Sequence, residues 1–192
     1  MGFWKDKSVI VTGSRMGIGK EMAIQLGKAG ANVMLNARNP KALKETEIEL
    51  KNLGYSVSSF AADISKPKDC KALIASTVNT FGSLDALINN AGLASQTDVA
   101  VIEPEVFKSI VDVNLNGAVF MTQAALPALK SSKGALLFCG SVAGVQGIGG
   151  YSVYSASKMA LKAVTQSLRI ELAKDDIHVA LAYIGFTQND PD

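Results

Sequence analysis

A serine, a tyrosine and a lysine stand at spacings suited to proton transfer between residues 141 and 158. Tyr154 and Lys158 are four residues apart in a run without Pro or Gly that extends to Asp175, which predicts a helix. Residues four apart share one face of a helix, so the Lys158 ammonium would lie near the Tyr154 phenol and favour the phenolate. Ser141 follows the apolar run 135–139, and its hydroxyl would be free at a strand end to hold a substrate oxygen. The three residues predict an acid–base centre.

Short apolar runs alternate with helical stretches along the chain. Strands separated by helices of ten or more residues indicate βαβ units, and hence a parallel sheet covered on both faces. No repeat, low-complexity tract or linker interrupts the pattern, so we expect residues 1–192 to form one doubly wound α/β domain. The predicted strands are 8–12, 32–36, 55–61, 85–89, 135–139 and 177–184, and the predicted helices include 40–52, 67–82, 104–130 and 154–175.

Composition is that of an ordinary globular protein, with 48% hydrophobic residues, 19% charged residues and a net charge of +2. The basic residues are scattered, so we expect no nucleic-acid partner, and no apolar run predicts a membrane span. The N-terminus lacks the layout of a signal peptide, which favours a cytoplasmic location. Cys70 and Cys139 are expected to be reduced, buried thiols, and His178 to be structural, so no metal site is predicted.

Three glycines follow the first predicted strand, at positions 13, 17 and 19. Glycines in a turn between a strand and a helix let the backbone turn tightly and approach a pyrophosphate closely. The start of a helix favours anions because its unpaired N–H groups and its dipole point at them. The turn therefore predicts a dinucleotide site.

Five motifs of this chain resemble those of the classical short-chain dehydrogenases/reductases. They are TGSRMGIG (12–19), NNAG (89–92), NLNG (114–117), Ser141 and YSASK (154–158), in the family's order and over essentially the whole chain. The resemblance implies a Rossmann fold with three α/β/α layers. It also implies a small-molecule carbonyl or alcohol substrate and hydride transfer with a nicotinamide cofactor.

The resemblance assigns a role to each catalytic residue. Tyr154 would be the general acid in carbonyl reduction and the general base in alcohol oxidation. Lys158 would promote ionisation of Tyr154 and bind the nicotinamide ribose, and Ser141 would polarise the substrate oxygen. Asn114 would kink its helix and hold a water through which a proton reaches Lys158.

Cofactor preference follows from charge near residue 38. An acidic residue at the end of the second strand binds the ribose 2′-OH of NAD, whereas an arginine there accommodates a 2′-phosphate. Here Ala37 takes the usual acidic position and Arg38 follows it, with Arg15 in the glycine turn, which favours NADP(H) over NAD(H). The alternative is that both arginines are surface charges.

Further cofactor contacts are implied by the resemblance. Asp63 and the backbone of Ile64 would meet the adenine, residues 90–92 the ribose, and Gly185 and Thr187 the carboxamide. Ile184 stands where the family has proline, which predicts a less preorganised turn. The predicted cofactor-binding residues are Gly13, Ser14, Arg15, Gly17, Ile18, Gly19, Arg38, Asp63, Ile64, Asn90, Ala91, Gly92, Tyr154, Lys158, Gly185 and Thr187.

Length is the main departure from the family, whose members usually continue for roughly another sixty residues with a substrate lid and a seventh strand. The sequence is therefore expected to lack both. This leaves two functions open: an NADP(H)-dependent carbonyl reductase or alcohol dehydrogenase, and a catalytically inactive nucleotide-binding or interaction module. For the enzyme, the substrate is either a 3-oxoacyl thioester or a bulky hydrophobic carbonyl.

Wide apolar faces are predicted on the helices that begin at Pro104 and Ser152. Part of each face would cover the sheet. By resemblance, the remainder would join subunits into a homodimer or homotetramer. The alternative is that every apolar residue there belongs to the core.

Overall fold

The computed structural model describes residues 2–187, in which six parallel strands form one sheet. The strand order is β3-β2-β1-β4-β5-β6, and each neighbouring pair is parallel. The order reverses beside β1, which is the place where open α/β sheets bind their ligands. The predicted doubly wound fold is confirmed. The strands are β1 (Ser8–Thr12), β2 (Asn32–Ala37), β3 (Val57–Ala61), β4 (Ala86–Asn89), β5 (Ala135–Ser141) and β6 (His178–Ile184).

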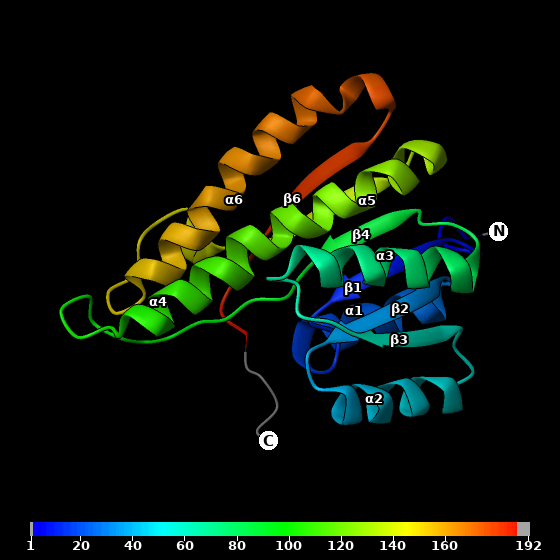
Figure 1. Ribbon diagram of the computed structural model, residues 1–192, viewed down its shortest axis with the longest axis horizontal. Helices are drawn as coiled ribbons and strands as arrows, with labels where there is room; N and C mark the ends of the chain where they lie inside the picture. Colours follow the sequence, from blue (N-terminus) through cyan, green and yellow to red (C-terminus); the bar gives the residue numbers. More distant parts are fainter. Residues whose placement is uncertain (1, 188–192) are drawn as a thin grey trace.

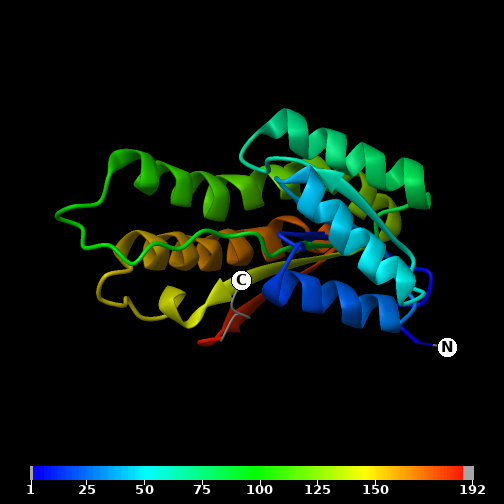
Figure 2. The same cartoon turned by 90° about the horizontal axis from the view of Figure 1, so that it is seen from below.

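Helices cover both faces of the sheet (Figures 1 and 2). One core joins α1 and α2 to Val9, Val11 and Val33, and the other joins α3, α5 and α6 to Ile10 and Met34. Neighbouring residues of one strand thus enter opposite cores, which explains why the inner strands are almost continuously apolar. The helices are α1 (Gly17–Lys28), α2 (Pro40–Asn52), α3 (Pro67–Phe81), α4 (Pro104–Val111), α5 (Ala118–Ser132) and α6 (Ser152–Glu171).

The single helix predicted for residues 104–130 is wrong. The structure divides it into α4, a π-helix at Asp112–Gly117 and α5. A π-turn inserts an extra residue into a helix, which changes the direction in which its side chains point. Apolar residues continue on both sides of the interruption, so the apolar pattern did not indicate it, but it includes Asn114, where the resemblance implies a kink.

Smaller differences concern the ends of several elements; strand β5, for example, continues to Ser141 rather than ending at residue 139. Strand β3 begins at Val57 rather than at residue 55, because Tyr55 donates its N–H to Leu50 O and packs its ring against Gly27. Helix α6 begins two residues before Tyr154, and a short 3₁₀ turn at Ala173–Asp175 follows its end.

In the part of the chain that the structure describes, no group of three or more His, Cys, Asp and Glu residues could hold a metal ion. Cys70 and Cys139 are free and buried, and His178 is exposed at the start of β6. Within residues 2–187, no helix combines the length and apolar character that crossing a membrane requires.

Glu47 on α2 is a buried carboxylate, only 3% exposed. It accepts hydrogen bonds from Lys44 Nζ at 3.0 Å, from Lys51 Nζ at 2.6 Å and from Ser59 Oγ on β3. Burial acts to raise the pKa of Glu47, but Lys51, Ser59 and Lys44 outweigh it and lower the pKa from 4.5 to about 2. The ionised carboxylate therefore holds α2 against the edge strand.

Replacing Glu47 by Gln tests this contact. At pH 7 the free energy of unfolding should fall by about 1–3 kcal/mol, because the charge-assisted bonds are lost. A carboxyl whose pKa is lowered on folding stabilises above its unfolded pKa, so the difference from wild type should shrink as the pH falls from 4.5 towards 2. Urea unfolding of both proteins at several pH values measures this difference in the free energy of unfolding. Glu49→Gln, which alters an exposed pair with Lys20, should change stability by about 0.5 kcal/mol or less.

Candidate active site

The Thr12 hydroxyl joins the ends of the two central strands. It donates to Ile88 O at 3.2 Å and accepts from the N–H groups of Asn90 and Ala91, both at 3.0 Å. The Asn90 amide returns a hydrogen bond to Thr12 O at 2.9 Å. This network fixes the segment after β4 beside the glycine turn after β1.

The glycine turn is closely packed and begins a helix. Gly13 has φ +66°, and a Cβ there would lie 2.8 Å from Ala91 Cα. A Cβ on Gly19 would lie 2.5 Å from Asn90 Nδ2, so only glycine fits. No side chain caps the start of α1, which leaves its first N–H groups for an anion.

A cavity of about 650 Å³ opens in front of this turn. It collects most of the predicted adenosine and phosphate contacts. Ser14 is the exception: it is fully buried, and its hydroxyl accepts from Asn36 N at 2.9 Å instead of facing the cavity. The lining includes Gly13, Arg15, Gly17, Ile18, Gly19, Arg38, Asp63, Ile64, Asn90, Ala91 and Gly92.

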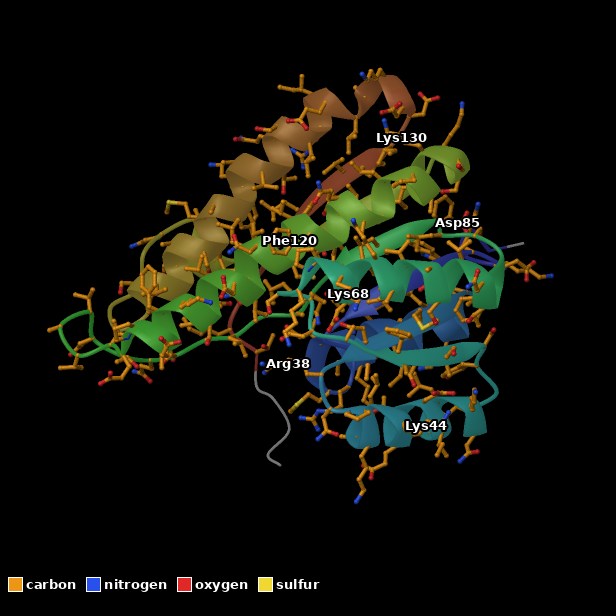
Figure 3. The ribbon with its side chains drawn as sticks, viewed as in Figure 1. Arg38, Lys44, Lys68, Asp85, Phe120 and Lys130 are labelled. Carbon is orange, nitrogen blue, oxygen red and sulfur yellow. The ribbon has the colours of Figure 1, made fainter. Side chains whose placement is uncertain are left out.

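Arg38 directly follows β2 and lines this cavity. Figure 3 shows it near the carboxyl end of the strand. Asp63 lines the same cavity after β3. Partial burial acts to raise the pKa of Asp63, but two hydrogen bonds from Ser65 and the charges of Lys66 and Arg38 hold it below its usual value. Asp63 is thus an acceptor near the Arg38 cation.

A second cavity, of about 240 Å³, contains three of the four predicted catalytic residues: Ser141, Tyr154 and Lys158. Gly185 and Thr187, predicted to hold the carboxamide, line it as well. It shares Ile18, Asn90, Gly92 and Leu93 with the larger cavity, so the two adjoin.

Lys158 is 5% exposed, and its ammonium donates to Cys139 O at 2.8 Å. The Nζ atom lies 5.8 Å from the centre of the Tyr154 ring, as expected for residues one turn apart. Burial lowers the pKa of Lys158 and raises the pKa of Cys139 to about 11. The site therefore contains a buried amine beside a neutral thiol.

Ser141 ends β5 and is 9% exposed. Its Oγ accepts from Ala143 N at 3.2 Å, which leaves the hydroxyl proton free to donate into the cavity. Tyr154 is partly exposed and lines the same cavity.

Asn114 lies in the π-helix, lines neither cavity and is 1% exposed. Its Oδ1 accepts from Leu93 N at 2.7 Å, and its Nδ2 donates to Leu93 O at 2.8 Å and to Ser157 Oγ at 3.0 Å. A Cβ on Gly92 would lie 3.4 Å from both Asn114 Oδ1 and Lys158 Nζ. Asn114 therefore positions the segment after β4 close to Lys158.

Comparison with known proteins identifies the family. The family model described as short chain dehydrogenase matches residues 7–191. The chain belongs to this family. The 11-beta-hydroxysteroid dehydrogenase A of Sesamum indicum is 34% identical over 186 residues, which are 96% of this chain and 53% of that protein. This chain thus spans about half the length of that relative.

Two other members show the breadth of the family. A diacetyl reductase ((S)-acetoin forming) of Staphylococcus epidermidis is 36% identical over 176 residues, 91% of this chain and 68% of that protein. The crystal structure of a 3-ketoacyl-(acyl-carrier-protein) reductase from Brucella melitensis complexed with NADH superposes with a TM-score of 0.92 at 30% identity. The superposition covers 97% of this chain and 78% of the Brucella melitensis chain.

Three parts of the candidate site were not predicted from the sequence. Leu93 lines both cavities, and the Cys139 carbonyl receives the Lys158 ammonium. A main-chain carbonyl carries no side-chain signal. Thr12, in contrast, stands in the glycine motif, where a hydroxyl at a strand end could have been recognised as a bridge.

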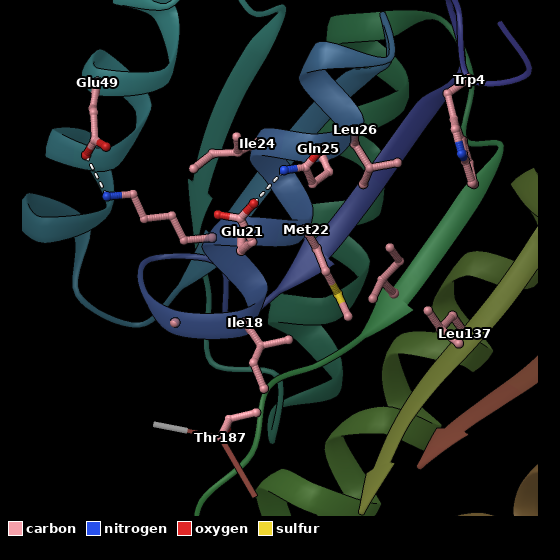
Figure 4. A pocket seen from close by; sticks show the side chains of 13 residues that line it. Trp4, Ile18, Glu21, Met22, Ile24, Gln25, Leu26, Glu49, Leu137 and Thr187 are labelled. Atoms are coloured by element: carbon pink, nitrogen blue, oxygen red, sulfur yellow. Dashed lines mark hydrogen bonds and ion pairs between the residues drawn. The ribbon is translucent and has the colours of Figure 1, made fainter. Parts of the chain in front are cut away.

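Another groove, of about 700 Å³, lies beside α1. Figure 4 shows Ile18, Met22 and Leu137 around it, with Thr187 at one end. It contains none of the predicted catalytic groups. We therefore place the candidate site in the two smaller cavities.

Replacing Asn114 by Ala tests the positioning contact. The free energy of unfolding should fall by about 1–3 kcal/mol, because Leu93 and Ser157 lose buried partners. The Leu93 amide proton should also exchange faster with solvent, as hydrogen-exchange NMR would measure. Asn116→Ala is the matched control, since Asn116 is in the same π-helix but only bonds Asp112. Equal changes in stability and in Leu93 amide exchange for the two variants would contradict the positioning role of Asn114.

Proposed function

We propose that the chain is the catalytic part of an NADP(H)-dependent oxidoreductase that interconverts a ketone or aldehyde with an alcohol. The observation that supports this most strongly is the buried Lys158 ammonium 5.8 Å from the Tyr154 ring, in one cavity with Ser141. A buried cation beside a tyrosine is the arrangement that acid–base work by a phenol requires. Family membership supports the same reaction class.

The described residues fit a dinucleotide. The close-packed turn at Gly13–Gly19 and the uncapped start of α1 suit a pyrophosphate, and the cavity of about 650 Å³ extends from there to Arg38 and Asp63. When bound, the nicotinamide supplies or accepts a hydride. The adjoining smaller cavity would place the substrate carbonyl among the catalytic side chains.

Each catalytic residue has a chemical task in this proposal. In carbonyl reduction, negative charge develops on the substrate oxygen, which the Tyr154 hydroxyl protonates. Ser141 donates a second hydrogen bond to that oxygen and holds it in place. Lys158 stabilises the tyrosinate that remains, and Asn114 positions the segment that closes this end of the cavity. In alcohol oxidation, Tyr154 accepts the proton instead.

NADP(H) is the proposed cofactor rather than NAD(H). Arg38 lines the larger cavity directly after β2, where Ala37 leaves no carboxylate to repel a 2′-phosphate. Arg15 lines the same cavity. The Brucella melitensis relative was crystallised with NADH, so the proposed preference rests on Arg15, Arg38 and the missing carboxylate at position 37, and not on the relatives.

The relatives leave the substrate open between a 3-oxoacyl thioester and a bulky hydrophobic carbonyl. We further propose a homodimer or homotetramer formed through α4, α5 and α6. Ile110, Met121 and Leu161 of the predicted apolar faces are buried, whereas Val106, Val119 and Met159 of the same faces are 38%, 37% and 46% exposed. A cytoplasmic location is also proposed, in line with two free, buried cysteines.

Tyr154→Phe tests the catalytic role. It removes one hydroxyl, so kcat should fall by roughly 10²- to 10⁴-fold while NADPH affinity changes little. NADPH oxidation with a ketone gives the rate, and fluorescence titration gives the affinity. Tyr55→Phe, on the opposite side of the sheet, should leave both unchanged. Retained turnover by Tyr154→Phe would contradict the role, and NADPH binding without turnover by wild type would favour the inactive nucleotide-binding module.

Arg38→Asp tests the cofactor preference. Loss of a charge-assisted bond to the 2′-phosphate should shift the ratio of NADPH to NADH affinity by about 10- to 100-fold towards NADH. Lys68→Asp makes the same change of charge at an exposed residue of α3 outside the cavity and should leave the ratio unchanged. An unchanged ratio in Arg38→Asp would mean that Arg38 does not contact the phosphate.

A further inference from the structure

We propose that Thr46 of α2 is a positioning residue for the cofactor preference. It holds Arg15 at the larger cavity, where Arg15 and Arg38 would together bind the 2′-phosphate of NADP(H). This inference rests on the proposed function, and it adds to the nucleotide site a residue that lines neither the larger nor the catalytic cavity.

The Thr46 hydroxyl is buried, and the whole residue is only 5% exposed. It donates to Arg15 O at 3.0 Å and to Ala42 O at 3.2 Å. The longer contact is made one turn back within α2, as is common for threonine in helices. The shorter contact leaves the helix and reaches the glycine turn. It fixes the main chain of that turn at the residue that carries a guanidinium.

Helix α2 is attached to both arginines that line the larger cavity. Its first turn follows Arg38 directly, and the Asn39 side chain caps its start. Thr46, in the second turn, bonds Arg15. The helix therefore acts as a rigid spacer between the two cationic side chains.

The opposite side of the glycine turn is held by other residues. Gly13 packs against Ala91, and Gly19 packs against Asn90, so closely that neither glycine has room for a Cβ. The Asn90 amide also donates to Gly13 O at 3.3 Å. The start of α1, which suits a pyrophosphate, is thus anchored independently of Thr46. Loss of the Thr46 hydroxyl should loosen Arg15 and spare the contacts that NADPH and NADH share.

The Arg15 guanidinium is available to a phosphate. It donates to the thioether sulfur of Met16, which is a weak acceptor. A phosphate oxygen accepts stronger, charge-assisted hydrogen bonds from arginine and would replace the sulfur. A side chain on a fixed main chain loses less freedom on binding than one on a mobile turn, so the Thr46 contact should increase affinity for the 2′-phosphate.

Other contacts keep α2 in place without the Thr46 hydroxyl. Glu49 pairs with Lys20 of α1 at 2.7 Å (Figure 4). Glu47 accepts a hydrogen bond from Ser59 of β3. Removing the hydroxyl should therefore leave the helix docked and release the main chain at Arg15.

Thr46→Val, which removes the hydroxyl at nearly constant shape, tests the proposal. Fluorescence titration should show that NADPH affinity falls by about 3- to 10-fold, whereas NADH affinity changes by less than about twofold. Thr46→Ser keeps the hydroxyl and should retain the wild-type ratio of the two affinities. An unchanged ratio in Thr46→Val, or an equal loss in Thr46→Ser, would overturn the proposal.

Thr77→Val is the matched control. Thr77 is fully buried on α3, and its hydroxyl donates to Leu73 O one turn back, as Thr46 does to Ala42 O. Thr77→Val should lower stability in urea unfolding by a similar amount and leave the ratio of NADPH to NADH affinity unchanged. If both variants lost the NADPH preference equally, the ratio would report general destabilisation, and the role of Thr46 would be refuted.

A double-mutant cycle with Arg15→Ala shows whether Thr46 acts through Arg15. In the Arg15→Ala background, Thr46→Val should change the affinity ratio by less than about twofold, because the side chain that Thr46 positions is absent. Additive losses of NADPH preference would contradict the proposed mechanism.

The same titrations separate this inference from the proposed function. A wild type that binds NADPH and NADH equally contradicts the proposed cofactor preference, and this inference with it. A wild type that prefers NADPH, together with an unchanged ratio in Thr46→Val, refutes the role of Thr46 and leaves the proposed function in place.

Discussion

The buried ammonium of Lys158 is the group on which the arrangement of the site depends. A buried cation is costly unless polar groups replace its water. Here the Cys139 carbonyl, at the end of β5, accepts its hydrogen bond at 2.8 Å. Because that partner belongs to the main chain, α6 is held against the end of β5, and Ser141 is two residues away. Gly144 completes the contact, since a Cβ there would lie 2.7 Å from the Lys158 carbonyl carbon.

The π-helix couples this centre to the larger of the two adjoining cavities. Asn114 bonds both main-chain groups of Leu93, which lines both cavities, and also Ser157, next to Lys158. A regular helix would direct the amide elsewhere, so the irregular backbone serves the site. Thr12 joins the same segment to the glycine turn through Asn90 and Ala91. Elements distant in sequence thus meet where the strand order reverses.

Much of this could be predicted from the sequence because it depends on local patterns. The alternation of buried strands and helices determined the parallel sheet, and the spacing of Tyr154 and Lys158 placed both on one helix face. Apolar periodicity could not predict the π-helix, because it is similar on both sides of residues 112–117; only the kink that the resemblance implies at Asn114 pointed to an irregular backbone there. The inward position of Ser14 and the Cys139 carbonyl contact depend on long-range packing, which no spacing in the sequence expresses.

The central claim is that the two adjoining cavities bring a nicotinamide and a carbonyl carbon into contact beside Tyr154. The most direct measurement is deuteride transfer from NADPH labelled at nicotinamide C4 to ethyl 4-oxopentanoate, followed by mass spectrometry of the alcohol. The account predicts deuterium on the new carbinol carbon with wild type and almost none with Tyr154→Phe. Saturated NADPH binding without any label in the alcohol would contradict it.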